Sequence, residues 1–455
     1  MGTFFSSLFY FALAIGVLIT VHEFGHFWVA RRLGVKVLRF SIGFGKPLWR
    51  WQRGPDQTEY VLAAVPLGGY VKMVDEREGE VAPQDLPVAF NRQPLSSRFA
   101  IVAAGPLFNF LFAILAYWLV FIIGTTGLKP LVGEVTAASP AATAGIEQGD
   151  EITSVDGEQT PTWRDVVLAL VDKALDGGSI PVTIRGGAGQ QRTVRLNMGS
   201  EAAKLDQGNL LSTLGLKPAR PQVPPVIGRL ESGGAAGQAG LKPGDRIVSA
   251  DGRPMDEWTP FALYIRKHPG ETVHLKVERG GATVPVDVVP KSVKTKGGEI
   301  GHIGAAARIP DDYDQRYFTA VRYSPLAAVG QSLHKTWEMS ALTLKMVGKM
   351  IVGDVSTHNI SGPLSIAQFA GTSANAGLSA FVSFLAIVSI SLGVLNFLPI
   401  PVLDGGHLFY YIIEFFKGSP VSDGVQAFGQ KLGLMIIMGL MVIAFYNDIV
   451  RLLNS

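Results

Sequence analysis

Residues 1–26 read MGTFFSSLFYFALAIGVLITVHEFGH, and the first 21 of them carry no charged side chain. About 20 apolar residues are enough to cross the hydrocarbon core of a membrane as a helix. A cleaved signal peptide would need a basic beginning and a small-residue cleavage site, and Met1-Gly2-Thr3 has no positive charge. We therefore expect a retained membrane span that ends in an H-E-x-x-H motif at residues 22–26.

Three further stretches without charged side chains predict three more membrane spans. They are Phe99–Leu128, Asn359–Leu403 and Leu432–Asn447, the second of which is apolar mainly from Leu378 onward. Of the 455 residues, 47% are hydrophobic and 17% charged, against about 25% charged in an ordinary soluble protein. This composition excludes a disordered chain and argues against a purely soluble enzyme. The fold class that we predict is a polytopic α-helical membrane protein with four transmembrane helices.

The charge balance and the lack of cysteine limit the chemistry. With 40 basic and 37 acidic residues the net charge is only +3, which gives no support for nucleic-acid binding. The chain has no cysteine, so it forms no disulfide and offers no thiolate to a metal. A bound metal ion would have to use His, Asp or Glu.

Basic residues behind the first span predict the orientation in the membrane. Short loops rich in Lys and Arg stay in the cytoplasm. The loop of residues 31–98 carries such residues directly after the span, namely Arg31, Arg32, Lys36, Arg39, Lys46, Arg50 and Arg53. We therefore expect the N-terminus and the long segment 127–375 on the outer side, with the ends of the first and third spans on the cytoplasmic side.

The outer segment contains an internal repeat. Residues 133–168 match the residues 95 positions later without a gap, in pairs such as Gly145/Gly240, Asp150/Asp245, Asp156/Asp251 and Trp163/Trp258. Both copies carry the pattern AG(I/L)xxGDxIxSxDG, which resembles the core of PDZ domains. Such domains bind an extended peptide as an added strand. Two alternatives stay open: the copies contact or gate peptides, or they only space or shield another site.

A segment after the repeats has helical apolar spacing. Between Tyr317 and Gly353, apolar residues recur with interleaved Lys and Glu, at Leu333, Trp337, Leu342, Met346 and Met350. This pattern indicates an amphipathic helix. The sequence does not separate packing on the outer domain from a position at the membrane surface.

The H-E-x-x-H motif carries the clearest chemistry. On a helix His22 and His26 share a face, so both imidazoles can bind one Zn²⁺. Glu23 can reach a water on the metal and act as general base for attack on a peptide carbonyl. The alternative is a polar cluster that caps the cytoplasmic end of the helix, although ionisable groups in a membrane usually mark function.

Topology suggests the third metal ligand. One span lies between the first and the third, so these two run parallel and end on the same side. At that end of the third span stands N-x-x-P-x-P-x-L-D-G, from Asn396 to Gly405, in which Asp404 is the first acidic residue after a long uncharged run. We assign Asp404 as the third ligand, against the alternative of an ordinary helix-end Asp. His407 is a candidate partner of the ligands, although a plain structural role is the simpler interpretation.

Together these motifs resemble the site-2 protease family of intramembrane zinc metalloproteases. The resemblance covers essentially the whole chain and includes bacterial members with four spans and a tandem PDZ pair. It implies that His22, His26 and Asp404 bind zinc, that Glu23 is the catalytic base, and that Asn396 helps to hold the substrate backbone. Asn109, in Ala104-Gly-Pro-Leu-Phe-Asn109, either lines the site or only bonds between helices.

The same resemblance implies a biological setting. The protein would lie in the bacterial inner membrane, with its N-terminus and PDZ domains in the periplasm and its active site near the cytoplasmic side. It would make the second cut in regulated intramembrane proteolysis, within the span of an already trimmed anti-sigma factor, in an envelope stress response. Remnant signal peptides would be further substrates.

A helical peptide bond must be unwound before it can be cleaved, most simply by pairing with an edge strand. Residues 39–45 and 60–73 are strand-like and interrupted by glycine. We expect membrane-associated hairpins beside the zinc, with Gly43, Gly45 and Tyr70 as candidate substrate contacts. The alternative is a plain cytoplasmic hairpin.

Rivals of other classes are a metal transporter, a non-catalytic PDZ adaptor, and a protease whose substrate lies outside the membrane. Many transporters contain an inverted repeat among their spans, and the spans of this chain show none. An adaptor would not need Glu23 between two histidines.

The expected organisation is the following: first transmembrane helix 1–30, β-hairpin loop 31–97, second transmembrane helix 98–126, first PDZ domain 127–220, second PDZ domain 221–310, amphipathic segment 311–375, third transmembrane helix 376–403, cytoplasmic segment 404–430 and fourth transmembrane helix 431–450.

Overall fold

The computed structural model contains four helices that are long and apolar enough to cross a membrane, among the residues that it describes. These residues are 2–174, 178–187, 189–197, 210–295, 298–353, 355 and 360–454. The four helices are α1 (Gly2–Arg32), α2 (Leu95–Ile123), α11 (Leu378–Phe397) and α13 (Asp423–Asn454). The prediction of a polytopic helical membrane protein with four spans is confirmed.

The last of these helices is longer than the uncharged stretch that predicted it. α13 begins at Asp423 and continues through Asp448, at which the uncharged stretch stops. Asp448 is only 1% exposed, because its carboxylate accepts hydrogen bonds from the backbone N–H groups of Gly362 and Leu364 and from the Ser365 hydroxyl. A charge that is satisfied in this way does not end the helix.

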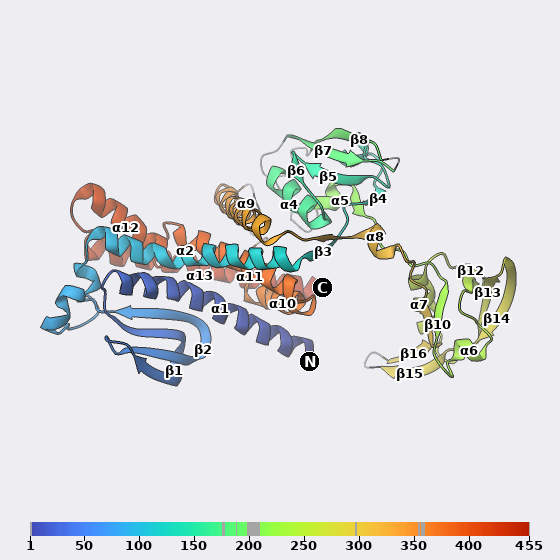
Figure 1. Ribbon diagram of the computed structural model, residues 1–455, viewed down its shortest axis with the longest axis horizontal. Coiled ribbons are helices and arrows are strands. Elements are labelled where there is room, and N and C mark those ends of the chain that lie inside the picture. The colour runs from blue at the N-terminus through green and yellow to red at the C-terminus, as the bar shows by residue number, and fades with distance from the viewer. Residues whose placement is uncertain are drawn as a thin grey trace.

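Helix α2 lies at the centre of the bundle, between α1 and α11 (Figure 1). Small residues let the helices approach closely: a Cβ atom at Gly25 of α1 would lie 2.5 Å from the carbonyl oxygen of Ala104 in α2. On the other side, the Ser389 hydroxyl of α11 donates a hydrogen bond of 2.8 Å to the carbonyl oxygen of Asn109. The central helix is therefore fixed on both sides by backbone contacts.

Two amphipathic helices join the bundle. α10 (Pro363–Asn375) packs against α1 and contacts α13, and α12 (Asp404–Lys417) packs against α2. The Arg98 guanidinium of α2 donates two hydrogen bonds to the Glu414 carboxylate of α12, at 2.6 and 3.2 Å. Parts of the segments 311–375 and 404–430 thus pack against the membrane helices. The uncharged stretch Asn359–Leu403 includes α10, but the sequence is mainly apolar only from Leu378 onward, and the charged residues of α12 keep that helix outside the uncharged stretches.

The loop after α1 forms a bent β-sheet. Its strands β1 (Val37–Arg53) and β2 (Thr58–Met73) lie along the C-terminal half of α1 (Figure 1). Both strands fold back, so that Phe40 of β1 lies opposite Val71 at one end of β2 and opposite Tyr60 near the other. Among the described residues Val71 pairs with Phe40 alone, so a second strand does not pair with this part of β2. The end of β2 is therefore an edge of the sheet. Two short 3-10 turns, Pro83–Val88 and Phe90–Arg92, lead on to α2.

The two halves of the outer segment share the order strand, helix, strand, strand, helix, strand, strand, and each ends in a strand that pairs with its first strand. Before that last strand, the first half has a helix and the second half has two strands. The first contains β4 (Val132–Val135), α3 (Pro140–Thr143), β5 (Glu151–Val155), β6 (Glu158–Gln159), α4 (Trp163–Ala174), β7 (Ser179–Arg185), β8 (Gln191–Asn197), α5 (Leu210–Leu214) and β9 (Leu216–Pro218). The second contains β10 (Ile227–Leu230), α6 (Ala235–Gln238), β11 (Arg246–Ala250), β12 (Arg253–Pro254), α7 (Trp258–Arg266), β13 (Val273–Arg279), β14 (Ala282–Val288), β15 (Lys291–Thr295), β16 (Gly298–His302) and β17 (Ala305–Ala307). The four-stranded sheets have the orders β6-β5-β7-β8 and β12-β11-β13-β14. We call these units the first and the second repeat.

The repeated Gly-Asp pair has a structural role in each unit. The Asp150 carboxylate accepts from the backbone N–H of Glu147, and the Asp245 carboxylate accepts from that of Lys242 in the same way. Each carboxylate also pairs with an arginine from the end of the sheet, Arg192 in the first repeat and Arg279 in the second. The shared motif therefore closes the same turn in both units.

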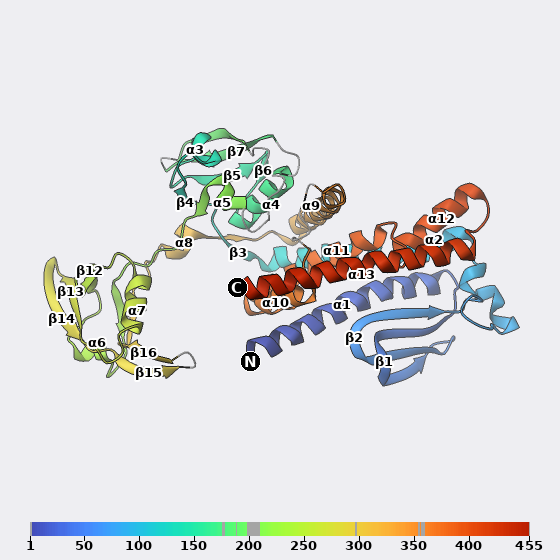
Figure 2. The ribbon, with the colours of Figure 1, turned by 180° about the vertical axis from the view of Figure 1, so that it is seen from behind.

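The first repeat lies against the membrane helices, and the second lies away from them in both views (Figures 1 and 2). The chain returns from the second repeat through α8 (Tyr313–Tyr317) and β18 (Phe318–Val321), and β18 pairs with β3 (Thr125–Leu128) at the end of α2. It continues into α9 (Pro325–Ile351), which packs across α2 and α11. The Lys345 ammonium of α9 donates a hydrogen bond of 2.9 Å to the Asp172 carboxylate of the first repeat.

Candidate active site

Three predicted ligand residues converge between the membrane helices. His22 and His26 lie one turn apart on α1, and Asp404 is the first residue of α12. The Oδ2 atom of Asp404 lies 3.1 Å from the Nε2 atom of His22 and 3.5 Å from that of His26, and the two Nε2 atoms are 3.3 Å apart. The structure therefore brings together side chains from the two ends of the chain.

This triangle has the dimensions of a zinc site. A tetrahedral zinc ion with ligands at about 2.0–2.1 Å keeps its ligand atoms about 3.3–3.4 Å apart. The Oδ2 atom of Asp404 is buried and makes no well-formed hydrogen bond in the described part of the chain, although it faces two nitrogen atoms. Two imidazoles and one carboxylate form a ligand set used by catalytic zinc, which keeps a fourth position for water or substrate.

Helix α2 orients both imidazoles. The Nδ1 atom of His26 lies 2.8 Å from the carbonyl oxygen of Ile101, so that it is the protonated nitrogen and leaves Nε2 free for a metal. The amide of Asn109, which is fully buried, lies 3.0 Å from Nδ1 of His22. When Nε2 of His22 faces the metal position, Nδ1 carries the proton and is a donor, as in His26. We therefore assign the amide oxygen of Asn109, and not the amide nitrogen, as its partner, because the orientation of an amide is assigned from its hydrogen-bond network.

A glycine of α2 makes room for the two histidines. A Cβ atom at Gly105 would lie 2.6 Å from Cε1 of His26 and 2.8 Å from Cε1 of His22. Carbon atoms pack at about 3.5–4.0 Å, so only glycine allows both rings to stand against this helix.

A tightly packed loop sets the position of Asp404. After α11 ends at Phe397, residues 398–403 turn the chain, with prolines at positions 399 and 401. Glycines 405 and 406 lie so close to this loop that a Cβ atom would collide with the backbone of Leu398 or Ile400, and Gly433 of α13 leaves room for the backbone of Pro401. The motif that follows Asn396 therefore encodes a loop that is held from two helices.

Glu23 faces the edge of the bent sheet. A Cβ atom at Gly69 of β2 would lie 3.0 Å from Cγ of Glu23 and 2.9 Å from Cγ2 of Ile19, so that β2 crosses directly beside α1 at this point. The backbone N–H of Val71 is directed towards the Glu23 carboxylate. A carboxylate thus lies one residue along the helix from His22 and next to a strand edge.

The remaining predicted residues lie outside the ligand cluster. Asn396 is partly exposed in the last turn of α11. Gly43 and Gly45 occupy the bend of β1 with φ angles of 90° and 89°, and Tyr70 accepts a hydrogen bond from Arg39 at 3.1 Å. His407 lies in the first turn of α12 and has no hydrogen bond to the ligands among the described residues.

Sequence reasoning missed the carbonyl of Ile101, the space at Gly105 and the Arg98–Glu414 ion pair. No local pattern marks a backbone carbonyl or a long-range ion pair. The glycine did carry a signal, because a glycine inside an apolar helix often marks a close approach of two helices.

Comparison with known proteins identifies the family. A family model, described as peptidase family M50, matches residues 10–440. The chain belongs to peptidase family M50. It is 46% identical over 445 residues to the regulator of sigma-E protease RseP of Escherichia coli, covering 97% of this chain and 98% of that protein. It is 42% identical to a putative zinc metalloprotease of Vibrio cholerae (97% and 98% covered), and 45% identical to one of Neisseria meningitidis (98% and 99% covered).

Membership of family M50 makes this protein a zinc metalloprotease of the site-2 type. The resemblance inferred from the two motifs is thereby confirmed, and the transporter and adaptor interpretations are excluded as the primary activity.

Proposed function

We propose that this protein cleaves a transmembrane segment of a single-span protein whose outer part has already been removed. The observation that carries this proposal is the position of the ligand cluster, which lies between helices long and apolar enough to cross a membrane. The substrate type is an anti-sigma factor, and remnant signal peptides form a second class. The name of the Escherichia coli relative, regulator of sigma-E protease, supports the first of these.

In this proposal His22, His26 and Asp404 hold the metal, and Glu23 is the catalytic base. A zinc ion held by these residues supplies Lewis-acid activation of a water molecule and of the scissile carbonyl. Glu23 accepts the proton of the attacking water and then delivers it to the leaving amine. Ile101 and Asn109 keep the imidazoles in the tautomer that binds metal.

The edge of the bent sheet receives the substrate. Residues 69–73 pair with β1 on one side only and pass next to Glu23 on the other. A substrate segment that pairs with this edge is extended, and its peptide bonds are freed from helical hydrogen bonds. Gly43, Gly45 and Tyr70 then shape the neighbouring part of the sheet, and Asn396 contacts the substrate backbone from α11.

Strand pairing can be tested separately from metal binding. Val71→Pro removes the backbone donor that faces Glu23 at the proposed edge. We therefore expect loss of cleavage with zinc content unchanged, because both strand pairing and the contact to Glu23 are lost. Trp51→Pro, at the other end of the sheet where Trp51 pairs with Tyr60, is the matched control. If the two variants cleave equally well, the edge does not hold the substrate.

Exposed apolar side chains support membrane association of the sheet. Leu48 and Trp49 of β1 are 69% and 67% exposed to the surroundings of the protein. Aromatic residues of this kind are common at membrane–water interfaces. Together with the basic residues behind α1, they favour an active site on the cytoplasmic side of the bacterial inner membrane.

The two repeats are proposed to be periplasmic PDZ domains, spanning residues 127–220 and 221–310. The matching strand orders of their four-stranded sheets support the domain type, and the position of the first repeat beyond the far end of α2 supports the orientation (Figure 1). They either bind the new end of a trimmed substrate or exclude substrates that are still untrimmed. The other domain boundaries follow the helices and strands described above.

The central experiment compares the wild type with Glu23→Gln on a pre-trimmed single-span substrate, with metal content measured on both. We expect the wild type to cut within the span, and the variant to hold about one zinc ion in this site without cutting. Equal cutting by both proteins would contradict the role of Glu23. A cut outside the span would contradict the intramembrane assignment.

A further inference from the structure

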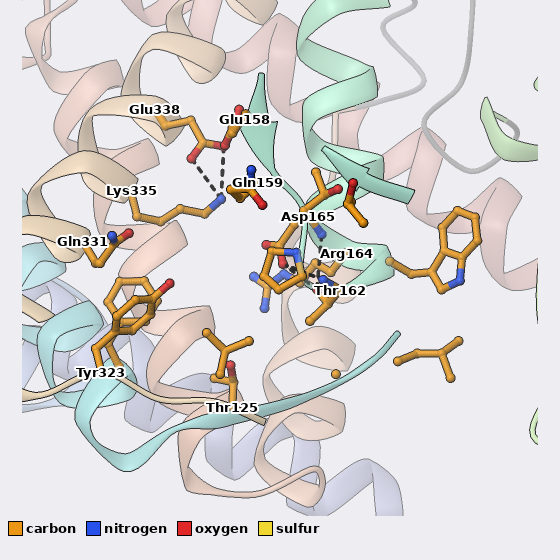
Figure 3. A pocket seen from close by; sticks show the side chains of 18 of the residues that line it. Thr125, Glu158, Gln159, Thr162, Arg164, Asp165, Tyr323, Gln331, Lys335 and Glu338 are labelled. Atoms are coloured by element: carbon orange, nitrogen blue, oxygen red, sulfur yellow. Dashed lines mark hydrogen bonds and ion pairs between the residues drawn. The ribbon is translucent and has the colours of Figure 1, made fainter. Parts of the chain in front are cut away.

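A second cavity lies far from the ligand cluster, between the first repeat, the outer end of α2 and helix α9 (Figure 3). Its volume is about 1030 Å³, and polar residues from all three parts line it. The proposed cleavage of a membrane span uses none of these residues. The cavity is therefore a candidate for a second role of this protein.

Three side chains of types that can bind a metal ion meet in this cavity. Glu158 comes from β6 of the first repeat, whereas His334 and Glu338 lie one turn apart on α9. Their ligand atoms all lie within 4.8 Å of one another. Apart from the ligand cluster, this is the only such group of three in the described part of the chain. A His and a Glu four residues apart on a helix face the same way, which suits a shared ion.

A tyrosine that lines the cavity has a buried hydroxyl group without a partner. Tyr117 of α2 is 3% exposed, lines the cavity, and its hydroxyl has no hydrogen-bond partner among the described residues. A buried tyrosine hydroxyl ordinarily finds a partner. Its charge environment includes Glu338 and Arg164, so it belongs to the same polar space as the three ligands.

The charges of the cluster favour a cation. The Glu158 carboxylate makes no hydrogen bond or ion pair with the described residues, and burial together with the charge of Glu338 raises its pKa above the usual value. The Lys335 ammonium lies 3.0 and 3.1 Å from the two carboxylate oxygens of Glu338, as the dashed lines in Figure 3 show. One lysine thus compensates two neighbouring carboxylates only in part.

We propose that Glu158, His334 and Glu338 form a second, structural zinc site that ties the first repeat to α9. One imidazole and two carboxylates are suitable ligands for zinc. An ion held by these residues would displace Lys335 from the Glu338 carboxylate. The ion joins an element of the outer domain to a helix that packs on α2 and α11, so its binding restrains the first repeat over the membrane helices.

The test counts zinc ions on the full-length protein in detergent micelles, dialysed against a fixed concentration of free zinc. The proposal gives about two ions per chain for the wild type and about one for His334→Ala or Glu158→Gln. His302→Ala is the matched control, because His302 is an exposed histidine of the second repeat. Retention of one ion by the variants shows that the membrane part has kept its fold.

Two further measurements test the second zinc site without counting bound ions. Lys335→Met removes the competing cation and should tighten the second zinc-binding step by about fivefold, as the loss of a partly exposed ion pair allows. Zinc should also slow amide hydrogen exchange in β6 of the wild type and leave β6 of His334→Ala unchanged. A wild type that binds one ion, or variants that bind as many ions as the wild type, would overturn the proposal and leave the proposed protease function untouched.

Discussion

The space at Gly105 leads to a sharp prediction, because one added methyl group meets both histidine ligands. In Gly105→Ala the new Cβ atom would lie 2.6 Å from Cε1 of His26 and 2.8 Å from Cε1 of His22. Both distances are about 1 Å shorter than ordinary carbon contacts. Either α1 and α2 move apart or the imidazole rings turn away from α2, and the second movement breaks the hydrogen bond to Ile101.

The two ways of relieving the collision have different costs. Overpacking of this size costs about 1–3 kcal/mol of stability. A metal site, however, tolerates shifts of only about 0.2 Å in its ligand distances, and the loss of an orienting hydrogen bond alone weakens metal binding by about 10–100-fold. We therefore expect Gly105→Ala to remain folded, to bind zinc at least about tenfold more weakly, and to cut slowly even at saturating zinc, since misplacement by about 1 Å costs about 10²-fold in rate.

The assay is a zinc competition with a chromophoric chelator, followed by cleavage of a single-span substrate at several zinc concentrations. Gly16→Ala is the control, because Gly16 lies on the same helix as the histidines and a Cβ atom there would meet nothing within 4 Å. The control should keep the zinc affinity and the cleavage rate of the wild type. If Gly105→Ala matches Gly16→Ala in both measurements, the packing argument is refuted.

Three other predictions concern stability. Arg98→Met leaves the Glu414 carboxylate unpaired and should lower the free energy of unfolding by about 3–5 kcal/mol, whereas the double variant Arg98→Met with Glu414→Met should lose less. Thermal unfolding in detergent compares the two variants, and equal losses of stability would contradict the pairing. Asp448→Asn weakens the hydrogen bonds that hold the start of α10 and should cost about 1.5–3 kcal/mol in the same assay, so an unchanged unfolding temperature would count against it. The guanidinium of Arg279 and the backbone N–H of Lys242 hold the pKa of Asp245 below its usual value, so this contribution to the stability of the second repeat is complete above about pH 4 and is lost as the pH falls through the lowered pKa. Amide exchange against pH should show this loss, and Arg279→Met should make it smaller.

Local spacing and topology made much of the candidate site predictable. The two histidines are four residues apart, so any helix places them on one face. Asp404 could be matched to them because parallel spans end at the same depth. The bundle was equally accessible, since uncharged apolar stretches of about 20 residues are typical of membrane-spanning helices.

The contacts that fix the site exactly were not predictable, because they join positions that are distant in the sequence. The carbonyl of Ile101 and the space at Gly105 become visible only when α1 and α2 are seen to cross at Gly25. Helices α10 and α12 were missed as parts of the bundle because their polar faces interrupt the apolar pattern. Helix α13 extends beyond the expected span of residues 431–450 at both ends, since the sequence does not show which charges will find partners.

The origin of the ligands at the two ends of the chain has a consequence for biosynthesis. A nascent chain that has been translated as far as the second repeat contains His22, His26 and Glu23, but it lacks Asp404 and the helices that pack on its loop. On the proposed ligand set, such a chain cannot complete the three-residue site. We therefore expect proteolytic activity to arise only after Asp404 and the helices that pack on its loop have been made, late in the synthesis of the chain.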